Sequence, residues 1–243
     1  MKNISFQLLI LLLLIFSCTT DNVENIDTEI IRRKTENTAR LEQDFTPANP
    51  ANTYDIAGKL HNDILDIYLA GNYQHSTIVQ ISQQIEIIAT ANSDLILLDT
   101  GTNLPINLDK VQEIVNNPQI RLDQEVVNST LTIAAKESLS SFMNDVFLRE
   151  NRSYQEIHES IISYEAIVIE NQDFNNEDKR IILTTSSIIR YSMYHALIKK
   201  DKDWDISIGH NVGGLIGAID NSSAAIRYSL VTGIFIHNAL KEL

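Results

Sequence analysis

Histidine is followed by asparagine three times in this sequence, at 61–62, 210–211 and 237–238. An imidazole can transfer protons near neutral pH, so a polar site built around one can perform acid–base chemistry. His61, Asn62 and His210 are therefore the first candidates for a catalytic site assembled from residues distant in the chain. The alternative is that chance produces such pairs in an asparagine-rich sequence.

Common sequence motifs of metal sites, serine nucleophiles and phosphate-binding loops are absent from the sequence. No two of the six histidines have the i, i+4 spacing of a zinc-binding helix, and His-Glu-x-x-His does not occur. Gly-x-Ser-x-Gly is missing, and so is a glycine-rich phosphate loop followed by lysine. We therefore expect neither a metal nor another cofactor.

One short segment resembles a catalytic loop of known enzymes. Asp99-Thr100-Gly101-Thr102, preceded by two leucines, is similar to the active-site loop of aspartic proteases. That chemistry requires two carboxylates sharing a proton, and the sequence contains one copy of the motif. The surrounding pattern is helical rather than β-rich, so we interpret the segment as a turn.

Cys18 is the only cysteine, and its chemistry follows from its position. A basic start at Lys2 leads into an apolar run from Phe6 to Phe16, and Ser17 precedes the thiol. This order is typical of a secretory signal, and the ending resembles the lipobox of bacterial lipoproteins. We expect residues 1–17 to be removed and Cys18 to be acylated; an ordinary signal peptide or membrane anchor is the alternative.

The expected location follows from the lipid and the charge. Acyl chains on Cys18 would bind the membrane, and two or three of them suffice for stable attachment. The formal charge of −13 repels phosphate backbones, so we expect no nucleic-acid partner. A cell-envelope location is predicted, at the outer membrane of a Gram-negative bacterium, where another envelope protein is a possible partner.

Two regions follow the predicted signal. Residues 18–52 are polar, with two prolines and one aromatic residue, which predicts a flexible tether. Residues 53–243 show helical spacing of apolar residues, which predicts an all-α domain, a single multi-helix bundle able to fold without the tether. Expected helices cover 54–70, 78–88, 108–116, 135–146, 153–168, 176–199, 206–219 and 223–240.

Local signals refine this expectation. Ser153 and Glu156 form a capping box, Asn176 is the expected cap of a long central helix, and only 94–105 looks extended. Gly58 within a helix predicts a close backbone crossing. Gly209, Gly213 and Gly217 share one helix face, which predicts tight packing within a buried C-terminal hairpin. Membrane insertion or self-association of that hairpin is the alternative.

The two ends of the domain carry a resemblance. The pattern Tyr-Asp-x-x-Gly-x-x-His-Asn from Tyr54, with a Gly/Ala-rich helix pair at the C-terminus, resembles a family of lipoproteins and secreted proteins of the Bacteroidota. Asn211, Arg227 and Tyr228 depart from the more glycine-rich tail of those relatives. The resemblance implies an envelope location and this architecture, and it implies no activity.

These observations predict a lipid-anchored helical envelope protein that acts by binding or by contact with other proteins. One alternative is an enzyme whose site is assembled from scattered histidine, asparagine and aspartate residues. The other is a membrane-active or immunity-type protein that uses its C-terminal apolar hairpin. The expected binding residues are Tyr54, Asp55, His61, Asn62, His210 and Asn211.

Overall fold

The computed structural model describes residues 46–98, 105–148, 152–199 and 208–241. These residues contain ten helices and no strand, so the predicted all-α bundle is confirmed. The compact unit runs from Pro47 to Leu243. The predicted signal, Cys18, the tether up to residue 45 and the Asp99–Thr102 segment lie outside the described residues.

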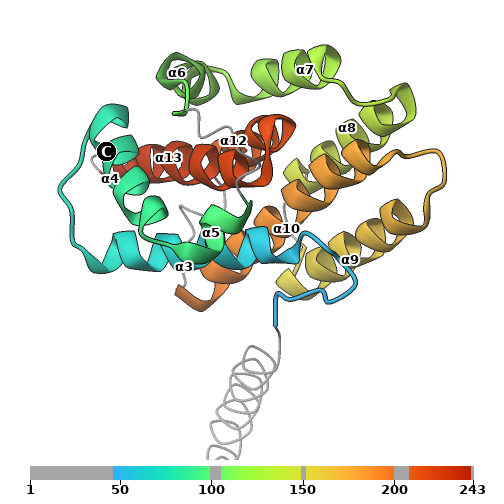
Figure 1. Ribbon diagram of the computed structural model, residues 1–243, viewed down its shortest axis with the longest axis horizontal. Coiled ribbons are helices and arrows are strands. Elements are labelled where there is room, and N and C mark those ends of the chain that lie inside the picture. Colours follow the sequence, from blue (N-terminus) through green and yellow to red (C-terminus); the bar gives the residue numbers. More distant parts are fainter. Residues whose placement is uncertain (1–45, 99–104, 149–151, 200–207, 242–243) are drawn as a thin grey trace, which may run out of the picture. The chain divides into compact units, whose positions relative to one another are not determined.

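Figure 1 shows the order of the helices in the compact unit. Their bounds are α3 Asp55–Ala70, α4 Ile78–Thr90, α5 Ser93–Leu98, α6 Leu108–Asn116, α7 Pro118–Asn128, α8 Ile133–Phe147, α9 Tyr154–Glu170, α10 Asn176–Lys199, α12 Ile208–Asp220 and α13 Ser222–Lys241.

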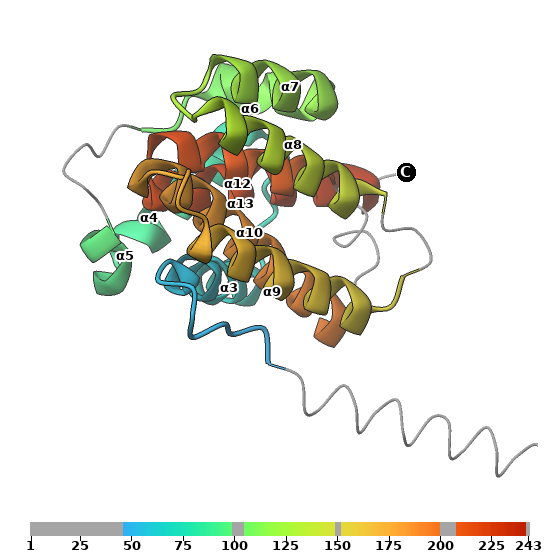
Figure 2. The ribbon, with the colours of Figure 1, turned by 90° about the vertical axis from the view of Figure 1, so that its right-hand side faces the viewer.

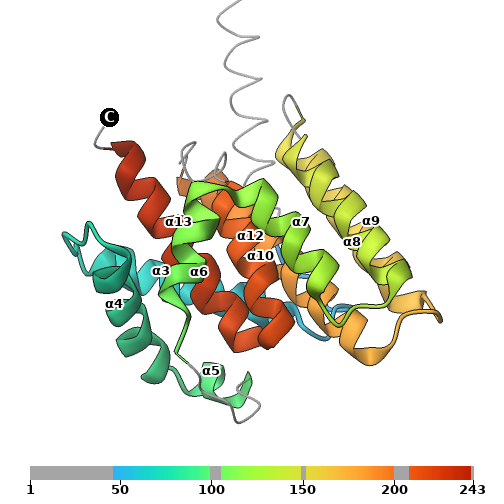
Figure 3. The same cartoon turned by 90° about the horizontal axis from the view of Figure 1, so that it is seen from above.

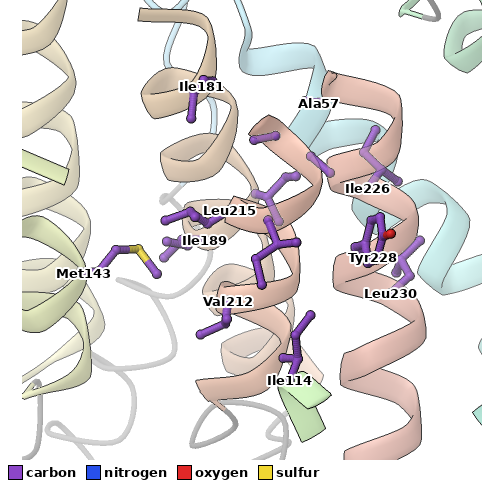
Figure 4. Packing of buried hydrophobic residues seen from close by; sticks show 14 of the residues in the cluster. Ala57, Ile114, Met143, Ile181, Ile189, Val212, Leu215, Ile226, Tyr228 and Leu230 are labelled. Atoms are coloured by element: carbon purple, nitrogen blue, oxygen red, sulfur yellow. The ribbon is translucent and has the colours of Figure 1, made fainter. Parts of the chain in front are cut away.

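Helix α10 is the central helix of the bundle, as its apolar residues on several sides predict. Every residue from Ile181 to Met193 is buried, because α3, α9 and α12 pack around it (Figure 2). Ile181 and Ile189 of α10 meet Val212 and Leu215 of α12 in the apolar core shown in Figure 4. Helix α13 in turn packs against α12 and α3, so these helices form one connected core with α10.

A second layer lies outside this centre. Helices α8 and α9 run side by side at one edge of the compact unit, as Figure 3 shows. The rings of Phe142 on α8 and Tyr164 on α9 stack with centroids 4.2 Å apart, and Ser138 hydrogen-bonds the Tyr164 hydroxyl. Ser153 and Glu156 form the predicted capping box at the start of α9.

Helices α12 and α13 form the C-terminal hairpin, and the glycines of α12 face α13. A Cβ atom at Gly213 would lie 2.8 Å from the backbone oxygen of Tyr228, and one at Gly217 would meet the backbone of Ala224. Gly209 lies against Ile236. The glycine face is therefore covered by α13. In the part of the chain that the structure describes, no helix is long and apolar enough to cross a membrane.

Two local expectations are wrong, and one helix, α7, was not expected. The segment expected to be extended contains α5, because Asn92 Oδ1 accepts hydrogen bonds from the Asp94 and Leu95 amides and starts a helix. The side chain of Asn175, not Asn176, caps α10. Pro118 ends α6 but also opens α7, since proline is suited to a first helical position.

The domain also begins earlier than expected. The compact unit starts at Pro47 rather than at residue 53, and the side chains of Asn49 and Asn52 are buried. In the sequence, asparagines within a polar segment are typical of a flexible tether. Here they donate hydrogen bonds to Glu165 of α9, which no local pattern reveals.

Candidate functional site

A buried carboxylate, Glu165 of α9, is the centre of a polar network inside the bundle. Its side chain is 0% exposed and accepts hydrogen bonds from Asn49 Nδ2 at 2.5 Å, Asn52 Nδ2 at 3.0 Å and Ser186 Oγ at 2.7 Å. Arg190 Nη2 lies 3.1 Å and 3.2 Å from its two oxygens. These donors satisfy a charge that burial would otherwise make very costly.

Arg190 of α10 joins this carboxylate to the start of α3. Its Nη2 also lies 2.6 Å from Asp55 Oδ1, and the hydroxyl of Tyr191 donates to Asp55 Oδ2 at 3.0 Å. Burial, with the nearby Asp55 charge, raises the pKa of Tyr191. One guanidinium thus serves two carboxylates, and Asp55 holds α3 against α10.

His61 continues the network from α3 to α13. Ser229 Oγ lies 3.0 Å from His61 Nε2, and His61 Nδ1 lies 3.0 Å from Asn62 Oδ1, while Asn62 Nδ2 donates to the Tyr191 carbonyl at 2.7 Å. Complete burial lowers the pKa of His61 to about 4. The imidazole is therefore neutral, with Nδ1 donating to Asn62 and Nε2 accepting from Ser229.

The chain of hydrogen bonds from the Ser229 hydroxyl through the His61 imidazole to the Asn62 amide resembles one found in hydrolases. In those enzymes the imidazole activates the hydroxyl as a nucleophile. In this chain both Ser229 and His61 are 0% exposed, so a substrate cannot reach the hydroxyl in this conformation. What the hydrogen bonds do is join α13, α3 and α10. The arrangement is structural.

The remaining predicted binding residues do not form one site. His210 and Asn211 are each about 1% exposed on α12. Tyr54 lines a small cavity of about 210 Å³ together with Lys179 of α10. The proposed catalytic set of His61, Asn62 and His210 is thus not open to solvent, since both of its imidazoles are buried.

A surface pocket of about 420 Å³ lies where the loop between α3 and α4 meets the last turns of α13. We call it the Tyr73 pocket; it is lined by Tyr68, Leu69, Asn72, Tyr73, Gln74, His75, Ser76, His237 and Asn238. Its size falls within the usual range for small-molecule sites, roughly 300–1,000 Å³.

Three aromatic rings form one wall of the Tyr73 pocket. The rings of Tyr73 and His75 stack, with centroids 5.2 Å apart and planes within 8° of each other. The Tyr68 ring lies 5.3 Å from that of Tyr73, and its hydroxyl is 3.3 Å from His75 Nδ1. Burial, together with Tyr73, raises the pKa of Tyr68 to about 12, so this phenol is neutral at physiological pH.

The loop that carries these rings is held in place by its neighbours. Asn238 Nδ2 of α13 donates to the His75 carbonyl at 2.9 Å, and Gln84 Nε2 of α4 donates to the Tyr73 hydroxyl at 3.0 Å. Asn72 has φ 49°, the left-handed conformation that asparagine tolerates best after glycine. The pocket is therefore preformed, and its backbone holds local strain.

None of the residues that line the Tyr73 pocket is acidic, and its only basic side chains are the imidazoles of His75 and His237. Although the chain carries −13, no Asp, Glu, Lys or Arg is among the lining residues. Amide and hydroxyl groups supply its hydrogen-bonding capacity. Among the described residues no three His, Cys, Asp or Glu side chains are grouped so as to hold a metal ion. The chemistry of the pocket therefore suits a neutral polar ligand.

A second hollow of about 500 Å³ lies between α4 and α13. Its lining is mostly apolar, and its two charged residues, Glu86 and Arg227, pair with each other at 2.9 Å. Arg227 also hydrogen-bonds Ser223. The charges of this hollow are already neutralised by one another, so it offers a ligand little beyond apolar surface.

Sequence reasoning missed the residues that matter most here. Glu165 and Arg190 gave no signal, because their partners lie far away in the chain. Only His237-Asn238, noted as a pair, lines the Tyr73 pocket. The run Tyr73-Gln74-His75-Ser76 directly after a helix stop was the signal that could have located the pocket.

No family model matches the chain, and neither a curated protein nor a solved structure matches it.

Proposed function

We propose that this chain is a lipid-anchored binding protein of the cell envelope, in which the Tyr73 pocket takes a small neutral ligand. The observation that carries the proposal is the pocket itself. It brings several aromatic rings, amide groups and a hydroxyl together at the surface of a helical scaffold. Pockets with apolar walls and a few fixed polar groups are the usual form of a binding site.

The alternatives have less support from the geometry. An enzyme built on His61 would need a substrate to reach a side chain that is 0% exposed. A membrane-active hairpin would need the glycine face of α12, which α13 covers. Binding at the Tyr73 pocket requires neither rearrangement.

The anchor is supported by the lipobox-like ending at Cys18, which the apolar run from Phe6 to Phe16 precedes. Metabolic labelling with a radioactive fatty acid, followed by membrane fractionation, tests it. We expect wild type to carry label and to stay with the outer membrane, and Cys18→Ser to carry none and to remain uncleaved or leave the membrane. Unchanged cleavage and membrane attachment of Cys18→Ser would contradict the anchor.

Binding is tested on the full lipidated protein by saturation-transfer NMR against a library of small fragments, neutral, anionic and cationic. We expect neutral fragments to bind wild type and to lose their signal in Tyr73→Ala. Tyr73→Phe keeps the ring and removes the hydroxyl that accepts from Gln84, so it should lose less of the signal than Tyr73→Ala does. The proposal fails if no fragment distinguishes Tyr73→Ala from wild type.

A further inference from the structure

We infer that the ligand of the Tyr73 pocket is a neutral carbohydrate, bound with one face of a sugar ring against Tyr73. This inference rests on the proposed function and narrows it to a ligand class. A sugar ring has an apolar face made of C–H groups and an edge made of hydroxyls. It therefore needs an aromatic surface next to short, uncharged hydrogen-bonding groups.

The aromatic surface is present and only partly used within the protein. Tyr73 packs against His75 and Tyr68, yet its side chain remains 36% exposed. Because Tyr73 and His75 already stack on each other, their rings do not form a slot that would hold a flat heterocycle between two faces. The part of this one ring that stays exposed suits a ligand that needs a single platform.

The hydrogen-bonding groups lie next to that platform. Asn72, Gln74 and Ser76 are exposed and belong to the same loop as Tyr73. Each amide side chain offers both donors and an acceptor, and the serine hydroxyl does both as well. Adjacent hydroxyls of a sugar donate and accept in the same way, so such side chains match them whichever way the ring is turned.

The composition of the lining favours a neutral ligand over the other small ligands. A carboxylate or phosphate would find no Lys or Arg in the pocket, only the imidazoles of His75 and His237, and an ammonium group would find no Asp or Glu. Three rings can also enclose a quaternary ammonium, but that requires ring faces turned toward the cation. Here the faces of Tyr73 and His75 are turned toward each other.

The experiment uses the full lipidated protein in a detergent without a sugar head group, applied to an array of neutral and acidic glycans. Calorimetry then follows with the best neutral glycan, with trigalacturonate, with adenosine and with choline. We expect a neutral glycan to bind and the other three to bind more weakly or not at all. Tyr73→Ala should weaken binding about tenfold or more, the equivalent of about 1.4 kcal/mol. Tyr73→Phe keeps the ring but loses the hydroxyl that accepts from Gln84, so it should weaken binding less than Tyr73→Ala does.

Gln74→Ala is a second variant, since this exposed side chain can be truncated without disturbing the core. We expect weaker glycan binding with an unchanged melting temperature. Absence of binding to every neutral glycan, or stronger binding of trigalacturonate, adenosine or choline, would overturn the inference. If neutral fragments still require Tyr73 while no glycan binds, the carbohydrate class is wrong and the proposed function stands. If neither fragments nor glycans bind, both fail.

Discussion

Glu165, Asp55 and Arg190 place three charged groups in or at the edge of the bundle interior, where apolar side chains would be expected. Removing one member of such a set leaves a buried charge uncompensated, which costs about 3–5 kcal/mol. Asn49, Asn52 and Ser186 complete the coordination of Glu165, so this carboxylate is bound by short polar side chains as well as by Arg190. Its members act together, and each depends on the others.

His61 should make stability depend on pH. Its pKa is about 4 in the folded chain, below the ordinary value of 6.5, so the unfolded chain binds the proton more readily. The free energy of unfolding that this imidazole contributes is complete above about pH 6.5. It falls as the pH drops toward 4, by about 3 kcal/mol in total. Urea unfolding of wild type between pH 7.5 and 4.5 measures this loss.

The matched variant is His61→Gln, whose amide keeps a donor and an acceptor but does not titrate. We expect it to lose less stability than wild type over the same pH range. Asp66 Oδ1 lies 3.2 Å from Nε2 of the nearby His195, and a charge on His195 acts on His61, so the difference between the two proteins is the relevant quantity. Parallel pH curves for the two proteins would refute the assignment.

At the scale of elements, the close contact between α12 and α13 depends on glycines of α12, which have no side-chain atoms to hold the two backbones apart. Gly213 and Gly217 leave no space for a Cβ, because the backbone of α13 lies directly against them. Gly214 lies between α10 and α13 at a looser contact, where a Cβ would be 3.4 Å from Ile188 Cγ2 and 3.7 Å from Ser229 Cβ, both ordinary contact distances. Three glycines within five residues thus have different packing constraints.

This difference predicts opposite signs for the same substitution. Gly213→Ala and Gly217→Ala should each lower the free energy of unfolding by about 1–3 kcal/mol, as overpacking does. Gly214→Ala should be neutral or stabilising by up to about 1 kcal/mol, since alanine is the better helix former. Thermal melts of the three variants test the hairpin. Equal melting temperatures in all three would mean that α13 does not press on α12.

At the scale of the whole compact unit, the segment from Pro47 to Asn52 acts as a strap across the start of the bundle. Asn49 and Asn52 donate to Glu165, and Asn52 also donates to the Leu183 carbonyl of α10. A segment whose apolar side chains are only those of two prolines and two alanines is thereby tied to α9 and α10. Its contribution to stability is carried by hydrogen bonds to a buried charge.

We therefore expect fragment 47–243 to unfold cooperatively and fragment 53–243 to be less stable by an amount on the order of 3 kcal/mol. Hydrogen bonds to charged groups contribute about 1.5–3 kcal/mol each, and the shorter fragment lacks two side chains that make them. Urea unfolding compares the two. The control is fragment 47–243 with Asn49→Ala and Asn52→Ala, which should behave like fragment 53–243. Equal urea midpoints for both fragments would show that the strap adds nothing.

The sequence by itself determined the all-α class and most helix positions, because the 3.6-residue spacing of Ile, Leu and Val is a local property. It also indicated the central role of α10, the capping box at Ser153 and the close approach at Gly58, which a Cβ would bring within 2.5 Å of the Ser187 carbonyl. Each of these follows from residues a few positions apart.

Only the tertiary structure decided which polar residues are buried and which are open to solvent. From the sequence, Asn49 and Asn52 are assigned to the tether and His61 to a candidate catalytic site. In the structure Asn49 binds Glu165 and His61 binds Ser229, and each partner is more than 100 residues away in the chain. The Tyr73 pocket likewise needs His237 and Asn238 of α13 to complete a loop that begins at Asn72. Such sites depend on contacts between distant segments, and a hydrogen bond across the fold leaves no periodic signal in the sequence.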